Sequence, residues 1–195
     1  QRLCVIPDGD LFQAIKKGKA DVVTGEIACF EKGGIAMADG ARLGADIIVT
    51  ATGLKMKLLG GARVTVGGQP LDTHEVLVYK GMMMSGVPNF ALAFGYTNNS
   101  WTLKTDLTAN LVCRILNYMD RKGYRVVVPE VPGDIQGEEF LPLDAGYMKR
   151  AKHILPKNGS KRPWRVYQNY LMDMLLTRFG RVGDRHLRFS SETKG

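Results

Sequence analysis

The sequence predicts an α/β fold that contains only part of a larger sheet. Residues 45–53 are continuously apolar through their middle, which is typical of a strand buried on both faces of a parallel sheet. Residues 90–94 form a second apolar run, which Gly95 closes. A helix pattern then opens at Trp101, where leucine and isoleucine side chains recur at helical spacing. A strand, a polar loop and a helix in this order are typical of α/β proteins.

The segments before residue 53 are expected to be short. A helix is predicted to start with Asp8 as its N-cap and to end near Gly18. Three strand-like runs follow, at residues 20–24, 26–30 and 35–38. The pair Asp39-Gly40 is typical of a hairpin turn. With the buried run at 45–53, these segments indicate the tail of an α/β domain.

The segments after residue 53 are more irregular. Residues 63–66 and 69–71 flank Gly67-Gly68 and predict another hairpin, and residues 80–89 are expected to form a loop. The helix from Trp101 should end before Gly123. Five prolines within residues 124–163 favour a chain that follows a surface rather than a sheet. A last amphipathic helix is expected at residues 164–178. Its predicted apolar face consists of Tyr167, Tyr170, Leu171, Met174 and Leu175.

Composition excludes several classes of protein. The chain has 195 residues, of which 45% are hydrophobic, and a net charge of +8. No apolar run approaches the roughly 18 residues of a membrane span, which excludes integral membrane proteins. Three separated cysteines fit a reducing compartment, so we expect a cytoplasmic protein. Three histidines offer no metal cluster, and no metal site is predicted. The chain begins with Gln1 rather than Met, and we expect it to be a fragment.

Basic residues are densest late in the chain. They are Lys149, Arg150, Lys152, Lys157, Lys161, Arg162 and Arg165, followed by Arg178, Arg181, Arg185 and Arg188. No helix-turn-helix, RNP-type or zinc-finger signature accompanies them. We interpret these residues as a solvated basic surface. Attraction to anionic lipid, with peripheral membrane contact, or to a phosphorylated cofactor stays open.

The segment from the apolar run at 90–94 into the helix resembles a binding site. Backbone N–H groups at a helix N-terminus lack intrahelical partners, and the helix dipole adds partial positive charge there. The alternative is that Ser100 or Thr102 is an ordinary N-cap. The run Met82-Met83-Met84 is likewise core filler or pocket lining. The chain contains neither G-x-G-x-x-G nor G-x-x-x-x-G-K-[ST], so it carries no phosphate cradle of these kinds.

Several stretches of the sequence resemble a known enzyme class. The run A-D-I-I-V-T-A-T-G at residues 45–53 is similar to the strand that closes the NADP domain of class B flavoprotein monooxygenases. The run G-Y-T-N-N-S-W-T-L-K at residues 95–104, with Y-K-G-M-M-M-S-G-V-P-N at 79–89, resembles the ethionamide-activating subgroup of Baeyer–Villiger monooxygenases. The resemblance continues through R-P-W-R at 162–165, Q-N-Y-L at 168–171 and L-R-F at 187–189. It covers essentially the whole chain.

The resemblance implies two Rossmann-like dinucleotide-binding domains, for FAD and for NADPH. Residues 1–53 would be the C-terminal end of the NADP-binding domain, and residues 54–195 the C-terminal part of the FAD-binding domain. The implied cofactor-binding residues are Gly95, Tyr96, Thr97, Asn98, Ser100, Trp101 and Thr102. The implied substrate-binding residues are Asn99, Ser100, Trp101 and Met83. The chain lacks the family fingerprint F-x-G-x-x-x-H-x-x-x-W, since Glu75-Val76-Leu77-Val78 follows His74. No catalytic residue is therefore assigned.

The expected parent enzyme inserts one oxygen atom from O2 into a ketone, or oxidises sulfur. Its expected partners are the small-molecule substrate, O2 and the rest of the parent chain, and not nucleic acid. We expect the fragment alone to be inactive, because its buried strands would have open edges. One alternative is a flavin-containing monooxygenase that prefers amines or sulfides. The other is a non-enzymatic basic module that binds anionic lipid or nucleic acid.

Overall fold

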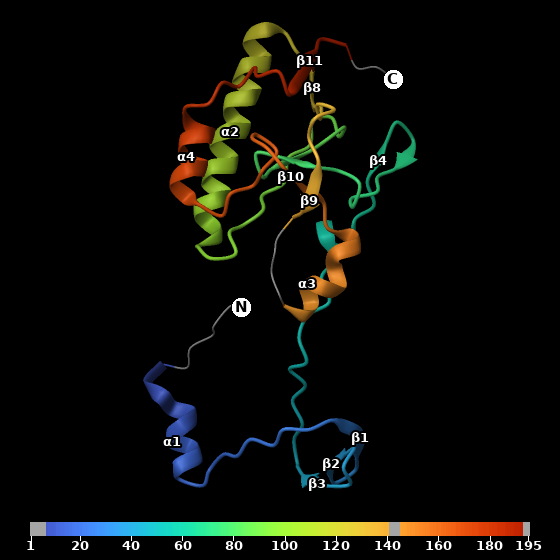
Figure 1. Cartoon of the computed structure of the whole chain (residues 1–195), viewed down its shortest axis with the longest axis vertical. Helices are drawn as coiled ribbons and strands as arrows, with labels where there is room; N and C mark the ends of the chain where they lie inside the picture. The colour runs from blue at the N-terminus through green and yellow to red at the C-terminus, as the bar shows by residue number, and fades with distance from the viewer. Residues whose placement is uncertain (1–6, 141–144, 193–195) are drawn as a thin grey trace. The chain divides into compact units, whose positions relative to one another are not determined.

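The computed structural model describes residues 7–140 and 145–192, and the chain divides into two units (Figure 1). One unit runs through Leu54, and the other begins at Lys55. Helices and small sheets are both present, in agreement with the predicted α/β class. The described strand pairs are all antiparallel. The assignment of the two units to an NADP-binding and an FAD-binding domain stays a prediction.

The first unit contains a short helix and a three-stranded sheet. A 3-10 turn, Pro7–Gly9, leads into α1 (Asp10–Lys16). The helix was predicted, but the N-cap is wrong: Gly9 occupies that position, and Asp8 lies in the 3-10 turn with φ 57°. The sheet has the order β1-β2-β3 and consists of β1 (Ile27–Glu31), β2 (Gly34–Met37) and β3 (Arg42–Gly44). Asp39-Gly40 forms the predicted turn, in which the Asp39 carboxylate accepts the N–H of Ala41.

The predicted buried strand at residues 45–53 is wrong for this chain. The segment forms no strand, and the side chains of Ile47 and Val49 are each 82% exposed. Residues 20–24 also form no strand. A strand needs a neighbour that receives its backbone hydrogen bonds, and no described strand lies beside residues 45–53. The apolar composition therefore shows that the side chains of this segment are suited to burial. Whether they are buried depends on a neighbouring strand.

Among the described residues, the second unit contains three α-helices, one of which is short, and four strand pairs. The helices are α2 (Trp101–Lys122), α3 (Gly146–Ala151) and α4 (Tyr170–Arg178), with 3-10 turns at Leu58–Gly61 and Lys152–Ile154. The paired strands are β4 (Thr65–Val66) with β5 (Gln69–Pro70), β6 (Val78–Tyr79) with β7 (Met83–Met84), β8 (Val126–Pro129) with β11 (Leu187–Ser190), and β9 (Gly137–Glu139) with β10 (Lys157–Gly159).

Helix α2 confirms the predicted helix. It begins at Trp101, and Gly123 follows its end with φ 68°, a conformation that glycine adopts without strain. Its buried apolar residues recur every four positions, at Leu107, Leu111, Ile115 and Met119. The hairpin predicted at residues 63–71 is also present, as β4 and β5.

Three other predictions for this unit need correction. Residues 90–94 form no strand; Phe90, Leu92 and Phe94 are half-buried against a small core cluster, while Ala91 and Ala93 are exposed. The proline-rich stretch does contain a buried strand, β8, which pairs with β11 near the C-terminus. Its proline stands last in the strand, where its missing N–H costs least. Part of the predicted loop at 80–89 likewise forms β7.

Helix α4 begins at Tyr170 rather than at Trp164, because Asn169 caps it and accepts the N–H of Met172. Its predicted apolar face is wrong. Leu171 and Leu175 are exposed, whereas Asp173 and Thr177 are buried. The helix lies beside α2 (Figure 1), and hydrogen bonds of Lys104 and Arg114 connect the two. The Arg114 guanidinium of α2 donates to the carbonyls of Thr177 and Gly180, which satisfies carbonyl groups at the end of α4.

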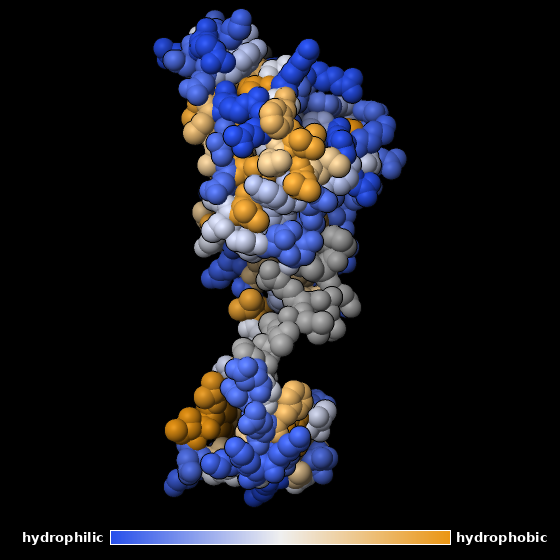
Figure 2. All heavy atoms as spheres, turned by 90° about the vertical axis from the view of Figure 1, so that its left-hand side faces the viewer, coloured by the Kyte–Doolittle hydropathy of each residue, from blue (hydrophilic) through white to orange (hydrophobic). Residues whose placement is uncertain are grey.

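Apolar side chains remain on the surface of this unit. Figure 2 shows orange patches among blue on the face that carries α4. The large exposed apolar residues of the unit are Trp101, Leu103, Leu116, Leu171, Leu175 and Phe179. Exposed apolar patches of this kind are typical of contact surfaces. Among the described residues, no helix is long and apolar enough to cross a membrane.

The main core is centred on Trp164, which is fully buried. Its ring packs edge-on against Tyr79 with 5.5 Å between ring centroids. Its Nε1–H donates to Nδ1 of His186 over 3.2 Å. Because Nδ1 accepts this hydrogen bond, His186 is held in its neutral form. Burial lowers the pKa of His186, an effect that nearby Asp184 opposes and Arg185 and Lys80 reinforce.

Acidification is therefore expected to destabilise the protein through His186. Below the ordinary histidine pKa of about 6.5, His186 takes up a proton in the unfolded chain but stays neutral in the folded chain. Stability should fall as the pH is lowered from about 7.5 to about 5.5, measured as the melting temperature. The His186→Gln variant keeps a hydrogen-bond acceptor and should show a shallower fall. The exposed His153→Gln variant is the control and should follow the wild type. An equally steep fall in both variants would contradict the role of His186.

Candidate functional site

The candidate site is the loop of residues 95–100 together with the first turn of α2. Tyr96 is buried beneath this loop, and its hydroxyl donates to Oδ2 of Asp173 on α4 over 2.8 Å. Burial, reinforced by Asp173, raises the pKa of the Tyr96 hydroxyl above its ordinary value. Tyr96 therefore stays neutral and acts as a hydrogen-bond donor that fixes one end of the loop.

The next two loop residues are held by Gln168. The Oε1 atom of Gln168 accepts the N–H of Thr97 at 2.8 Å and its hydroxyl at 3.1 Å. The amide of Asn98 donates to the backbone carbonyl of Gln168 over 3.3 Å. Residues 96–98 are thus attached to a segment about 70 residues further along the chain. These hydrogen bonds fix the loop conformation on the side that faces residues 168–173. The opposite side of the loop is open.

A buried ion pair lies directly under the loop. The ammonium of Lys104, only 3% exposed, donates to Oδ2 of Asp173 over 2.6 Å. The same oxygen accepts the Tyr96 hydroxyl, and the Lys104 ammonium lies 5.4 Å from the centroid of the Tyr96 ring. A buried charge requires a partner of opposite sign. Asp173 therefore joins α4, α2 and the loop in one network, which we call the Asp173 network.

The open side of the loop consists of Asn98, Asn99 and Ser100, whose side chains are exposed. Ser100 occupies the N-cap position of α2 but makes no side-chain capping bond. Its hydroxyl pairs instead with that of Thr102, at 2.7 Å. The ordinary N-cap considered for Ser100 or Thr102 is therefore not formed, and the first N–H groups of α2 lack a side-chain acceptor from the N-cap. Such a helix end suits a ligand with carbonyl oxygens or negative charge.

Trp101 lies against Gly95. A Cβ atom on residue 95 would overlap Cγ and Cδ2 of the Trp101 ring. The absence of a side chain at Gly95 therefore makes room for Trp101, which is 60% exposed. An exposed aromatic side chain beside an uncapped helix end supplies an apolar wall. Among the predicted cofactor- and substrate-binding residues, those from Asn98 to Thr102 thus share one surface beside Gly95 and Thr97, whereas Tyr96 is buried beneath the loop.

Met83 is placed apart from this surface. It is buried in the main core with Leu111 and Ile115. It also lines a pocket of about 230 Å³ with Phe90 and Val112, in which none of residues 95–102 takes part. Met82, Met83 and Met84 are all buried, which agrees with the alternative that they fill the core. Their assignment to a substrate pocket stays a prediction.

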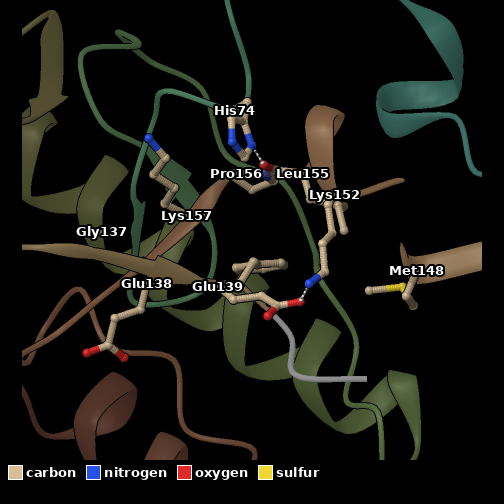
Figure 3. Close-up of a pocket in the computed structure, with 10 residues that line it drawn as sticks. His74, Gly137, Glu138, Glu139, Met148, Lys152, Leu155, Pro156 and Lys157 are labelled. Carbon is tan, nitrogen blue, oxygen red and sulfur yellow. Dashed lines mark hydrogen bonds and ion pairs between the residues drawn. The ribbon is translucent and has the colours of Figure 1, made fainter. Parts of the chain in front are cut away.

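A further pocket, of about 270 Å³, lies beside β9 and β10 (Figure 3). The ring of His74, whose Nδ1 lies 3.1 Å from the carbonyl of Leu155, borders it. Glu139 and Lys152 point toward one another there and form an ion pair at 3.1 Å. Lys157 pairs with Glu75 at 3.1 Å. The charges of Glu139, Lys152 and Lys157 are thus compensated within the chain.

Gln168, Asp173 and Lys104 were not among the predicted site residues. Gln168 lies in a stretch that carried the family resemblance, so that signal was present. Asp173 interrupts an otherwise apolar helix, and a charged residue at an inward position indicates a buried partner. Lys104 ends the run at 95–104 that carried the resemblance, but its pairing with Asp173, 69 residues away, had no signal in the sequence.

Comparison with known proteins relates the chain to one group of enzymes. It is 51% identical over 191 residues to the FAD-containing monooxygenase EthA of Mycolicibacterium smegmatis, and 52% identical over 191 residues to EthA of Mycobacterium tuberculosis. Each alignment covers 97% of this chain and 39% of the relative. Over nearly its whole length, the chain is similar to the FAD-containing monooxygenases. The family resemblance predicted from the sequence is confirmed.

A third FAD-linked monooxygenase gives the same result. The probable FAD-binding monooxygenase AlmA of Acinetobacter baylyi is 46% identical over 197 residues, which cover 99% of this chain and 39% of the relative. The chain thus spans about two fifths of the length of these monooxygenases. No family model and no solved structure matches it.

Proposed function

We propose that this chain is the C-terminal part of an FAD- and NADPH-dependent monooxygenase of the Baeyer–Villiger type. Residues 1–53 would end the NADP-binding domain, and residues 54–195 would complete the FAD-binding domain. The proposed enzyme inserts one oxygen atom from O2 into a ketone or oxidises a sulfur group. The observation that carries the proposal is the loop 95–102, held by Gln168 and Asp173 and open on its other side.

The residues present suit one edge of a flavin. The uncapped N-terminus of α2 would stabilise negative charge that develops on a ring carbonyl, because the helix dipole places partial positive charge there. Asn99, Ser100 and Trp101 would line the adjoining substrate pocket. When bound, FAD supplies the chemistry of oxygen activation, with NADPH as reductant. The chain's own contribution is to position and to shield the cofactor.

The test uses the full-length protein that contains this sequence. We expect it to purify with FAD and to oxidise NADPH faster when a simple ketone or an aryl methyl sulfide is added. Mass spectrometry should then detect the ester or the sulfoxide. Oxidation of amines in place of ketones would indicate a flavin-containing monooxygenase of the other subgroup. A protein that binds no FAD and oxidises no NADPH would contradict the proposal.

Gln168 provides a variant that tests the loop itself. Gln168→Leu removes the side-chain acceptor for the Thr97 N–H and hydroxyl, at a cost of about 1–2 kcal/mol in loop order. We expect the affinity for FAD to fall about tenfold, measured by fluorescence titration of the apoprotein. The exposed Gln136→Leu serves as the control and should leave the affinity for FAD unchanged. An unchanged affinity for FAD in the Gln168→Leu variant would show that the loop conformation does not contribute to FAD binding.

A further inference from the structure

A recess of about 320 Å³ lies at the C-terminal end of α4, away from the loop 95–102. Its walls come from α4, from the turn that follows it and from the segment around Pro163. The charged residues that line it are Lys80, Arg162, Arg181, Asp184 and Arg185, and His186 lies beside them. Four cations and one carboxylate thus face the same small volume.

The single carboxylate is already engaged. Oδ2 of Asp184 accepts the hydroxyl of Tyr79 at 2.6 Å and lies 3.2 Å from the Lys80 ammonium. Oδ1 accepts the N–H of His186 at 3.0 Å. The Lys80 side chain is itself buried, and its ammonium also contacts the carbonyl of Arg181. The negative charge of Asp184 therefore compensates the positive charge of Lys80. The positive charges of the three arginines remain.

None of these arginines forms an ion pair with a described carboxylate. Arg162 contacts the sulfur of Met172 and lies over the ring of Tyr167. Arg185 approaches Nε2 of His186 at 3.5 Å. Asp134, the nearby carboxylate whose pKa Arg185 helps to lower, is paired with Lys161 at 3.1 Å. Elsewhere in the unit exposed cations do find carboxylates, as Arg188 does with Glu130.

We propose that this recess binds the phosphate group of an anionic ligand. Guanidinium groups present planar pairs of donors that match phosphate oxygens, and three of them line the recess. An anion would also remove the mutual repulsion of three like charges around one recess. The recess shares no lining residue with the loop 95–102, so the proposal does not depend on the proposed enzymatic function.

The proposal is tested with inorganic phosphate on the FAD-loaded full-length protein. Isothermal titration should show a saturable phosphate site in the wild type. The double variant Arg181→Gln/Arg185→Gln should weaken phosphate binding by about tenfold or more, because two charged hydrogen-bond donors are lost. Arg178→Gln is the matched control, since Arg178 lies on α4 but does not line the recess. Equal phosphate affinity in the double variant and the wild type would overturn the proposal.

A second measurement distinguishes two sources of the phosphate group. Flotation with vesicles that contain phosphatidic acid presents the same phosphate monoester on a lipid surface, with neutral phosphatidylcholine vesicles as reference. Binding to inorganic phosphate alone supports a soluble ligand. Additional binding to the anionic vesicles, lost in the double variant, supports a lipid headgroup. Binding to neither form overturns the proposal. Thermal melting of each variant verifies that the fold is retained.

Discussion

Replacing Asp173 by alanine is expected to lower the free energy of unfolding by about 3–5 kcal/mol. The Lys104 ammonium would remain almost fully buried without its carboxylate, and the Tyr96 hydroxyl would lose its acceptor. Because both groups lie under the loop 95–102, we also expect the protein to lose FAD. Urea unfolding monitored by circular dichroism measures the first effect, and flavin absorbance after gel filtration measures the second.

A matched triple variant separates charge from packing in the Asp173 network. Tyr96→Phe, Lys104→Met and Asp173→Leu together keep a similar volume and leave no buried group unpaired. Replacement of a buried ion pair by apolar residues is often close to neutral. The triple variant should therefore be more stable than Asp173→Ala. A loss of less than about 1 kcal/mol in Asp173→Ala would show that the buried pair contributes little.

The two tryptophans of the chain are expected to behave oppositely on replacement by alanine. Trp164 is fully buried among Tyr79, His186 and the methionines of the core, and its loss should cost about 3–5 kcal/mol. Trp101 is largely exposed and should cost about 1 kcal/mol or less, although it lines the proposed flavin and substrate pocket. Urea unfolding of the two variants compares these costs.

Trp101→Ala, the less destabilising of the two variants, should have the larger effect on activity among variants that fold. We expect Trp101→Ala to lower the rate of NADPH-dependent oxygenation while its melting temperature changes by only a few degrees. Trp101→Phe keeps an aromatic wall and should recover most of the rate. Full activity in Trp101→Ala would place this side chain outside the substrate pocket. A fully stable Trp164→Ala would contradict the arrangement of the core.

Several predictions that depended on local patterns agree with the structure, although the N-cap predicted at Asp8 does not. The stripe from Leu107 to Met119 and the glycine at position 123 are sufficient to define α2 and its end. The turn pairs Asp39-Gly40 and Gly67-Gly68 define two hairpins in the same way. Helical spacing and turn chemistry act over a few residues, so the sequence carries them directly.

Predictions that depended on distant partners failed. The run at residues 45–53 is apolar enough for a buried strand, but no described strand receives its hydrogen bonds. Helix α4 turns Asp173 toward α2 and leaves Leu171 exposed, which is the reverse of its hydrophobic pattern. Residues 126–129 form a buried strand only because β11, about 60 residues later, pairs with them. In each case the partner lies far away in the sequence.

The sequence by itself determined the similarity of this chain to FAD-containing monooxygenases, its α/β class, the helix at residues 101–122 and the position of the loop that leads into it. Only the tertiary structure decided what holds that loop. Gln168 and Asp173 reach it from about 70 residues away, and Lys104 supplies the buried charge. Pairings of this kind depend on how helices pack against each other. The sequence contains both partners, but it does not show that they come into contact.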